Sequence, residues 1–121
     1  KQMTVQECCE SIGADFEGVL GRMGSEAMVK RFALKFLDEP SYRSLVKAVE
    51  EQNAEGAFRA AHTLKGICLN LGLDGLYEVC ASLTERLRGR EFNGYEEAYG
   101  KVQQEYQNTV DAIRTMAESG N

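Results

Sequence analysis

The sequence has few of the features that break helices or build sheets. It contains a single proline in 121 residues, and no segment alternates regularly between apolar and polar residues. Because such alternation marks a half-buried strand, its absence argues against β structure. No apolar run approaches the roughly 18 residues that span a bilayer, and no basic segment followed by an apolar one opens the chain. We therefore expect no membrane association, while the start at Lys1 leaves the place of the chain in a larger protein open.

Basic residues and metal-binding side chains are also scarce. The chain has 14 basic against 19 acidic residues, for a net charge of −5, which disfavours a general nucleic-acid binder. None of the four cysteines forms a C-x-x-C pair, and a single histidine leaves a zinc site few ligands. We interpret the cysteines as small buried thiols, typical of a reducing compartment, and expect a cytoplasmic protein. These residues are Cys8, Cys9, Cys68 and Cys80.

The spacing of apolar residues predicts an all-α protein. Apolar residues recur every three or four positions, and short breaks rich in glycine and helix-capping residues separate these segments. Asp15, Ser25 and Asn53 are expected to cap helices, and Ser41 to start one. Amphipathic helices joined by short loops bury their apolar faces by packing antiparallel. We therefore predict one domain over residues 1–121: an antiparallel four-helix bundle with additional short N-terminal helices and a core of about residues 25–117.

One segment, residues 54–71, carries the chemistry. At about 100° per residue, a single stripe of this helix contains Ala57, Ala61, Leu64, Cys68 and Leu71, and it should face the core. His62 lies roughly 140° from the centre of that stripe, so it should point to solvent or to a partner. Histidine has an unperturbed pKa of about 6.5, so a neutral ring nitrogen is available as a nucleophile near pH 7 without a dedicated base.

The neighbours of His62 on the helix surface fit such a role. Phe58 and Leu69 are expected to be exposed apolar side chains beside the imidazole and to form a docking patch; for Phe58 the alternative is that its side chain bends back into the core. Gly66 in mid-helix costs about 0.5–1 kcal/mol relative to alanine, which the close approach of a partner would compensate; relief of crowding between bundle helices is the alternative. Lys65 and Arg59 would place positive charge beside the imidazole, where it could stabilise an anionic group such as a phosphoryl group.

These residues resemble the histidine phosphotransfer (HPt) family, whose pattern reads approximately His-x-Leu-Lys-Gly followed by Leu or Met and Gly. His62, Leu64, Lys65, Gly66, Leu71 and Gly72 match it in type and spacing. The resemblance implies that His62 is the phospho-acceptor, that Lys65 stabilises phosphate charge, and that Gly66 leaves room for the partner. Ile67, Cys68 and Leu69 depart from the pattern, because smaller residues often occupy these positions.

The resemblance also implies the partners. They would be receiver domains of response regulators and a hybrid sensor histidine kinase. The receiver would supply the phosphorylated aspartate and the Mg²⁺, so that the chain needs no cofactor or metal of its own. The chain would be a phosphocarrier in two-component signal transduction, with no kinase activity of its own. Separately, we expect a monomer, because a complete bundle in one chain needs no second copy. An independent enzyme is disfavoured, because no Gly-rich phosphate loop or acidic metal cluster accompanies the histidine.

Two alternatives within this reading stay open. The chain could be the phospho-accepting domain of a chemotaxis-type histidine kinase, phosphorylated by an ATP-binding domain. It could also be a binding module with an HPt-like fold that is never phosphorylated. The dimerisation domain of an ordinary sensor kinase is disfavoured, because its histidine is usually followed by an acidic residue and then a proline. Here Thr63 follows His62, and the proline is Pro40.

Overall fold

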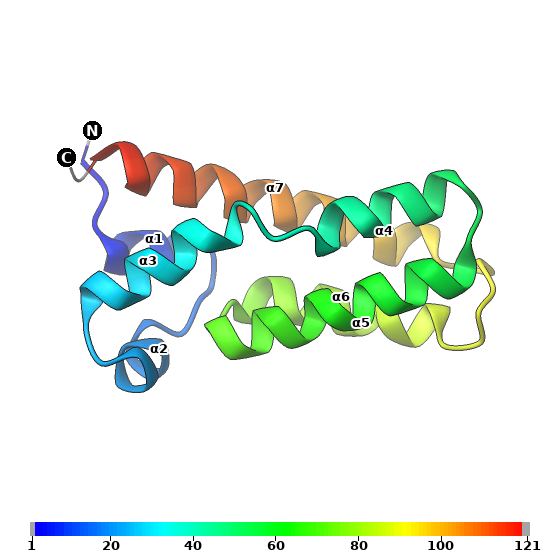
Figure 1. Cartoon of the computed structure of the whole chain (residues 1–121), viewed down its shortest axis with the longest axis horizontal. Helices are drawn as coiled ribbons and strands as arrows, with labels where there is room; N and C mark the ends of the chain where they lie inside the picture. The colour runs from blue at the N-terminus through cyan, green and yellow to red at the C-terminus, as the bar shows by residue number, and fades with distance from the viewer. Residues whose placement is uncertain (1, 120–121) are drawn as a thin grey trace.

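The computed structural model describes residues 2–119, and these residues form seven α-helices and no strand. The four bundle helices are α4 (Ser41–Glu50), α5 (Ala54–Leu71), α6 (Asp74–Leu87) and α7 (Glu96–Ser119). They lie side by side and run antiparallel along the long axis of the molecule (Figure 1). The prediction of an all-α bundle is confirmed. No described helix is both long enough and apolar enough to cross a membrane.

Three further helices precede the bundle: α1 (Val5–Ser11), α2 (Phe16–Met23) and α3 (Glu26–Phe36). They gather at one end of the molecule, where α3 continues roughly in line with α4 along the later half of α7 (Figure 1). The additional N-terminal helices were expected from the sequence. They cover the part of α7 that extends beyond the other bundle helices.

Local sequence signals set most helix starts. The side chains of Asp15, Ser25 and Asn53 accept hydrogen bonds from backbone N–H groups three residues later, with lengths of 3.1, 3.3 and 2.9 Å. All three caps were predicted. Ser41 is the first residue of α4, as expected, but it caps no N–H group; its hydroxyl hydrogen-bonds the carboxylate of Glu39.

The turn between α5 and α6 requires a glycine. Gly72 ends α5 with φ = 68°, in the left-handed region that residues with a Cβ atom rarely adopt. A Cβ atom there would also lie 2.1 Å from Cγ2 of Val19. The carbonyl oxygen of Gly72 accepts a 3.0 Å hydrogen bond from the backbone N–H of Asp15, which ties this turn to the N-terminal helices.

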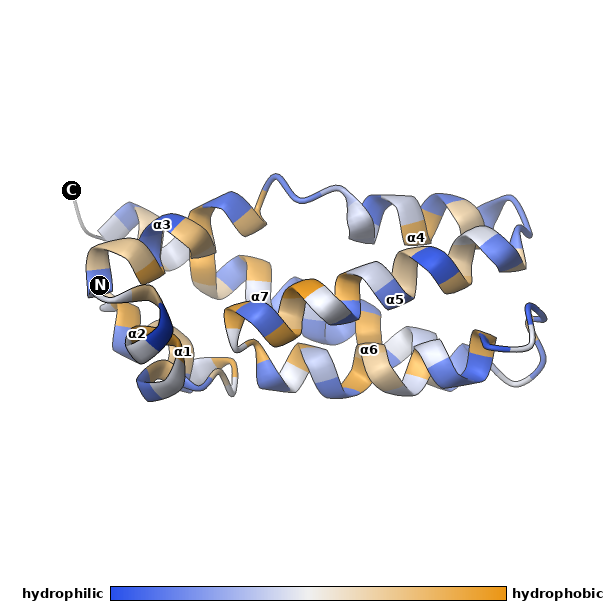
Figure 2. Cartoon of the chain, turned by 60° about the horizontal axis from the view of Figure 1, so that its bottom comes forward, coloured by the Kyte–Doolittle hydropathy of each residue, from blue (hydrophilic) through white to orange (hydrophobic). Residues whose placement is uncertain are grey.

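The core runs along the whole bundle. In Figure 2 the hydrophobic bands of the helices turn towards one another. The α6 stripe is buried as its spacing predicts, since Leu76, Cys80, Leu83 and Leu87 are each at most 1% exposed. Helices α4 and α7 meet through a stacked tyrosine pair, Tyr42 and Tyr106, whose ring centroids are 3.7 Å apart and whose planes differ by 8°. This stack closes the seam between the first and last helices of the bundle.

Candidate functional site

Helix α5 positions the candidate site by burying its opposite face. Ala57, Ala61, Leu64 and Cys68 are completely buried, while Leu71, the last residue of the predicted stripe, is half-buried. His62 is exposed on the outer face, as its angle from the stripe predicts. Within residues 2–119, the imidazole forms no hydrogen bond or ion pair, and its one ring contact is with Phe58. The ring nitrogens of His62 are therefore unoccupied by protein partners in this part of the chain.

The surface next to His62 is open at Gly66. A Cβ atom built on Gly66 would meet no atom within 4 Å, leaving out the backbone of its own helix. Crowding between bundle helices therefore does not require glycine at this position, and that alternative is wrong. Leu69, two turns along from His62, is 57% exposed and is the one large apolar side chain that stands out on the surface of the described residues. Its exposure was predicted.

Phe58 does not lie where the sequence suggested. Its side chain is only 8% exposed, so the prediction of an exposed apolar side chain there is wrong. The reason is a cover supplied by the loop after α6, where the guanidinium carbon of Arg90 lies 3.9 Å from the ring centroid and that of Arg88 lies 5.6 Å away. The Phe58 ring also lies nearly parallel to the imidazole of His62, with centroids 6.0 Å apart and planes at 16°.

The two predicted cations have different surroundings. Arg59 donates from Nε to a carboxylate oxygen of Glu55 over 2.9 Å, and Arg90 donates to the other oxygen over 3.0 Å. Hydrogen bonds from Arg90 and then Arg59 hold the pKa of the Glu55 carboxyl below its usual range. The charge of Arg59 is therefore directed along the helix towards Glu55.

Lys65 lies on the α6 side of the helix. It belongs to no ion pair within residues 2–119. The pKa of Glu85 is lowered, first by hydrogen bonding to Arg88 and then, with a smaller part, by the charge of Lys65. Of the two predicted cations, Lys65 is the one whose charge no direct partner in the described residues holds.

Two open grooves flank α5 on its α3–α4 side. One has a volume of about 580 Å³ and runs between the start of α4 and the first half of α5, including Arg59 and Thr63. The other, of about 250 Å³, lies between α3 and the last turns of α5, with Phe32, Ile67 and Asn70 in its walls. The outer face of α5 is therefore bordered by recesses into which a partner surface could fit.

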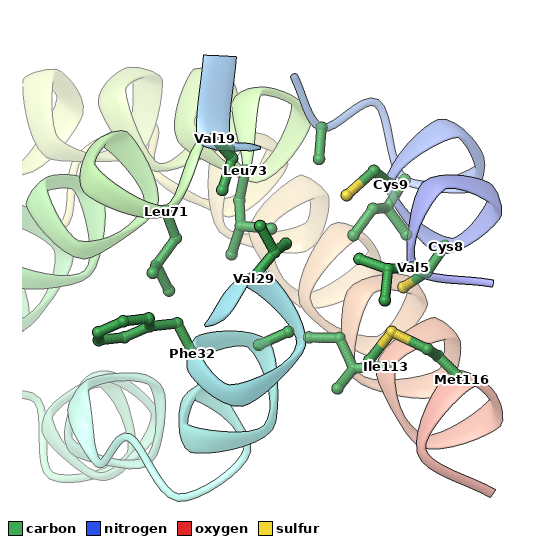
Figure 3. Close-up of a pocket in the computed structure, with 13 residues that line it drawn as sticks. Val5, Cys8, Cys9, Val19, Val29, Phe32, Leu71, Leu73, Ile113 and Met116 are labelled. Atoms are coloured by element: carbon green, nitrogen blue, oxygen red, sulfur yellow. The ribbon is translucent and has the colours of Figure 1, made fainter. Parts of the chain in front are cut away.

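Figure 3 shows a cavity away from His62, between the N-terminal helices, α7 and the α5–α6 turn. Its walls are almost wholly apolar and include Val29, Leu73, Ile113 and Met116. The volume of about 30 Å³ corresponds to little more than one water molecule, so the cavity is a packing defect rather than a ligand site.

The cysteines match the prediction of buried free thiols. Cys8 and Cys9 are 3% and 8% exposed, and Cys68 and Cys80 are 0% and 1% exposed. A hydrogen bond with Cys80, together with burial, raises the pKa of Cys68. No group of three or more histidine, cysteine or acidic side chains in the described residues is arranged to hold a metal ion.

Sequence reasoning missed two residues at this site, Arg90 and Glu55. Arg90 lies in a loop 35 residues after its carboxylate partner, so no helical spacing points to it. The spacing of Glu55 and Arg59 does predict an ion pair between neighbouring turns, but it does not reveal the second cation.

Comparison with known proteins gave a match to a family model. A family model described as Hpt domain matches residues 39–116, which is more than half of the chain and includes all of α4, α5 and α6. Neither the search of curated proteins nor the search of solved structures returned a match.

Proposed function

Because the chain belongs to the Hpt domain family, whose members serve phosphotransfer in two-component systems, we propose that it is a phosphorelay intermediate with His62 as the phospho-acceptor. His62 accepts a phosphoryl group from an aspartate of one receiver domain and donates it to an aspartate of another. The observation that carries this proposal is the exposed imidazole, which has no hydrogen-bond partner among residues 2–119, beside the open surface at Gly66.

The chemistry needs little from the chain itself. A lone pair on a ring nitrogen of the neutral imidazole attacks phosphorus, a nitrogen–phosphorus bond forms, and the bond to the aspartate oxygen breaks. The electron pair of that bond leaves with the carboxylate, and the proton on the other ring nitrogen stays on the ring. The return transfer runs the same steps backwards. The outer face of α5 therefore acts by presentation and charge, and the Mg²⁺ that neutralises the phosphoryl oxygens comes with the receiver.

The surroundings of His62 support different roles for its neighbours. Lys65 supplies positive charge near the phosphoryl group, since no ion pair within residues 2–119 holds its ammonium group. Gly66 and Leu69 offer a flat opening and an exposed apolar side chain for receiver docking. Arg59 contributes to docking from the rim of the face, where it stays paired with Glu55.

The partners follow from this chemistry. We propose that a receiver domain of a hybrid sensor histidine kinase supplies the phosphoryl group and that a response regulator takes it. The chain works as a monomer in the cytoplasm, as a carrier without kinase activity of its own. A bundle that buries its own apolar stripes needs no second copy to complete its core, which supports the monomer.

The test is phosphoryl transfer from a panel of phosphorylated receiver domains, in the presence of Mg²⁺, to the wild-type chain and to His62→Gln. The sequence contains one histidine, so the variant removes every candidate for phosphohistidine. We expect acid-labile label on the wild type only, with unchanged helical circular dichroism in the variant. Label retained by His62→Gln would refute the assignment.

A wild-type chain that no receiver labels would contradict the proposed relay. Labelling by an ATP-binding kinase domain would then identify a chemotaxis-type phospho-acceptor. Stable binding of a kinase or receiver without any label would identify a binding module that is not phosphorylated.

A further inference from the structure

Phe58 and His62 form a stacked pair at the centre of the proposed site. The two residues are one helical turn apart on α5, and their rings lie 6.0 Å apart at 16°, within the range of offset aromatic stacking. Phe58 is buried against the core, whereas His62 is exposed. The pair thus connects a fixed side chain to one that solvent would otherwise leave free to rotate.

Arg90 holds the Phe58 ring in place from the loop between α6 and α7. Its guanidinium group lies 3.9 Å from the Phe58 centroid, donates from Nε to Glu55 over 3.0 Å, and donates from Nη1 to the carbonyl oxygen of Arg88 over 2.6 Å. The backbone N–H of Arg90 adds a 2.8 Å hydrogen bond to the carbonyl oxygen of Leu87. These four contacts together hold the Arg90 side chain over the Phe58 ring.

The backbone of Arg90 is unusual as well. Its φ of 59° lies in the left-handed region, which is energetically unfavourable for a residue with a Cβ atom. Such a backbone conformation persists only where surrounding contacts hold it in place. At Arg90 the contacts of the side chain with Glu55 and Phe58 hold this conformation in place. The loop is thus built so that its arginine reaches back to the first half of α5.

We propose that Phe58, held by Arg90 and Glu55, is a positioning residue that restricts the imidazole of His62 to the orientation used for phosphoryl transfer. This inference rests on the proposed function and assigns the α6–α7 loop a part in it. The ring of Phe58 does not touch the phosphoryl group; it acts through the imidazole.

The physical reason is the cost of a freely rotating nucleophile. An imidazole on an open helix face samples up to three χ1 wells and a broad, roughly two-fold χ2, and one combination presents the reactive nitrogen to the receiver. Stacking on a fixed ring selects one of these combinations before the partner arrives. The imidazole therefore loses less rotational entropy when the transition state forms. Because χ1 near +60° is rare inside a helix, two χ1 wells and two χ2 orientations become accessible when the ring is released, and transfer should slow roughly two- to fourfold.

Stacking also suits the charge that develops on the ring. When a neutral imidazole nitrogen bonds to phosphorus and the proton on the other ring nitrogen stays in place, the ring becomes an imidazolium cation. An aromatic face stabilises a nearby cation through its quadrupole. Phe58 therefore favours the same state that transfer produces.

The first test reads the orientation of the imidazole without phosphorylation. With one histidine in the sequence, its ring protons give a single set of NMR resonances. Phe58→Leu should remove the ring-current shift of these protons and average the χ1 couplings of His62, whereas Phe58→Tyr, which keeps a ring, should preserve both. Arg90→Gln should give an intermediate result. Unchanged shifts and couplings in Phe58→Leu would overturn the proposal, whatever the outcome of the labelling experiments.

The second test separates positioning from stability and from docking. Phe16→Leu is the matched control, because Phe16 on α2 is also 8% exposed and loses the same atoms. In single-turnover transfer from a phosphorylated receiver, Phe58→Leu should lower the saturating rate roughly two- to fourfold and leave the half-saturating receiver concentration unchanged, while Phe16→Leu changes neither. An equal loss in both variants would make Phe58 a core residue only, and a change confined to the half-saturating concentration would make it a docking residue. Either result overturns the proposal. A wild-type chain that accepts no label refutes the proposed function instead and leaves the NMR result standing.

Discussion

Gly66→Ala should make the protein more stable and a poorer phosphoryl carrier. Alanine is favoured over glycine inside a helix by about 1 kcal/mol, because glycine loses more backbone freedom on folding. Gly66 lies in the interior of α5, and a Cβ atom added there meets nothing within 4 Å, so no clash offsets this gain. We therefore expect the free energy of unfolding to rise by about 0.5–1 kcal/mol.

Thermal and urea unfolding followed by circular dichroism measure this gain. For a domain of this size, 1 kcal/mol corresponds to a rise of about 4 °C in Tm. Gly100→Ala is the matched control, because Gly100 lies within α7, is exposed, and also leaves open space around an added Cβ atom. Both variants should gain stability to a similar extent.

The two variants should differ in transfer. If a receiver packs closely over Gly66, an added methyl group costs about 1–3 kcal/mol at that contact, as in an overfilled core. The rate of transfer at low receiver concentration should then fall at least about fivefold in Gly66→Ala and further in Gly66→Leu, while Gly100→Ala keeps the wild-type rate. A loss of stability in Gly66→Ala would show that the fold needs this glycine. Normal transfer by Gly66→Leu would show that no partner approaches Gly66.

Two further predictions concern charge and the buried thiols. Lys65→Ala should slow transfer about three- to tenfold without abolishing it. The difference from wild type should be smaller at high salt, because dissolved ions screen the charge of an exposed lysine. An unchanged rate at low salt would show that Lys65 has no part in transfer. Burial raises the pKa of the Cys8 thiol from an ordinary 9.0 to about 11, so the unfolded chain ionises first, and the part of the free energy of unfolding that depends on Cys8 is constant below pH 9 and falls between pH 9 and 11. Cys8→Ala should remove about 2 kcal/mol of that alkaline loss in urea titrations, and an identical pH profile in both proteins would contradict the assignment.

The helices and the outward direction of His62 could be predicted because they depend on neighbours in sequence. Caps at Asp15, Ser25 and Asn53 each involve a backbone group three residues away, and the position of His62 follows from the period of one helix. These features involve no contact between residues far apart in the sequence. The same spacing rules located the buried stripe of α6.

The burial of Phe58 could not be predicted in the same way. The periodicity of α5 places Phe58 beside His62 on the outer face, and in an isolated helix it would be exposed. Arg90 covers it from a loop, and the left-handed backbone of that residue carries no signal in the sequence. Whether Gly66 relieves a clash or leaves an opening likewise depends on how the other helices pack, and the spacing of residues does not contain that information.

The stacked tyrosines at the seam of the bundle give the protein an optical signal of its own. The sequence contains no tryptophan, so tyrosine dominates its near-ultraviolet absorption and emission. Two tyrosine rings held 3.7 Å apart and nearly parallel are chromophores fixed in one asymmetric arrangement, and such a pair gives circular dichroism that freely rotating rings do not. Detachment of α4 from α7 would extinguish this band even if every helix remained intact. The near-ultraviolet spectrum thus distinguishes a closed bundle from a loosened one without any added label.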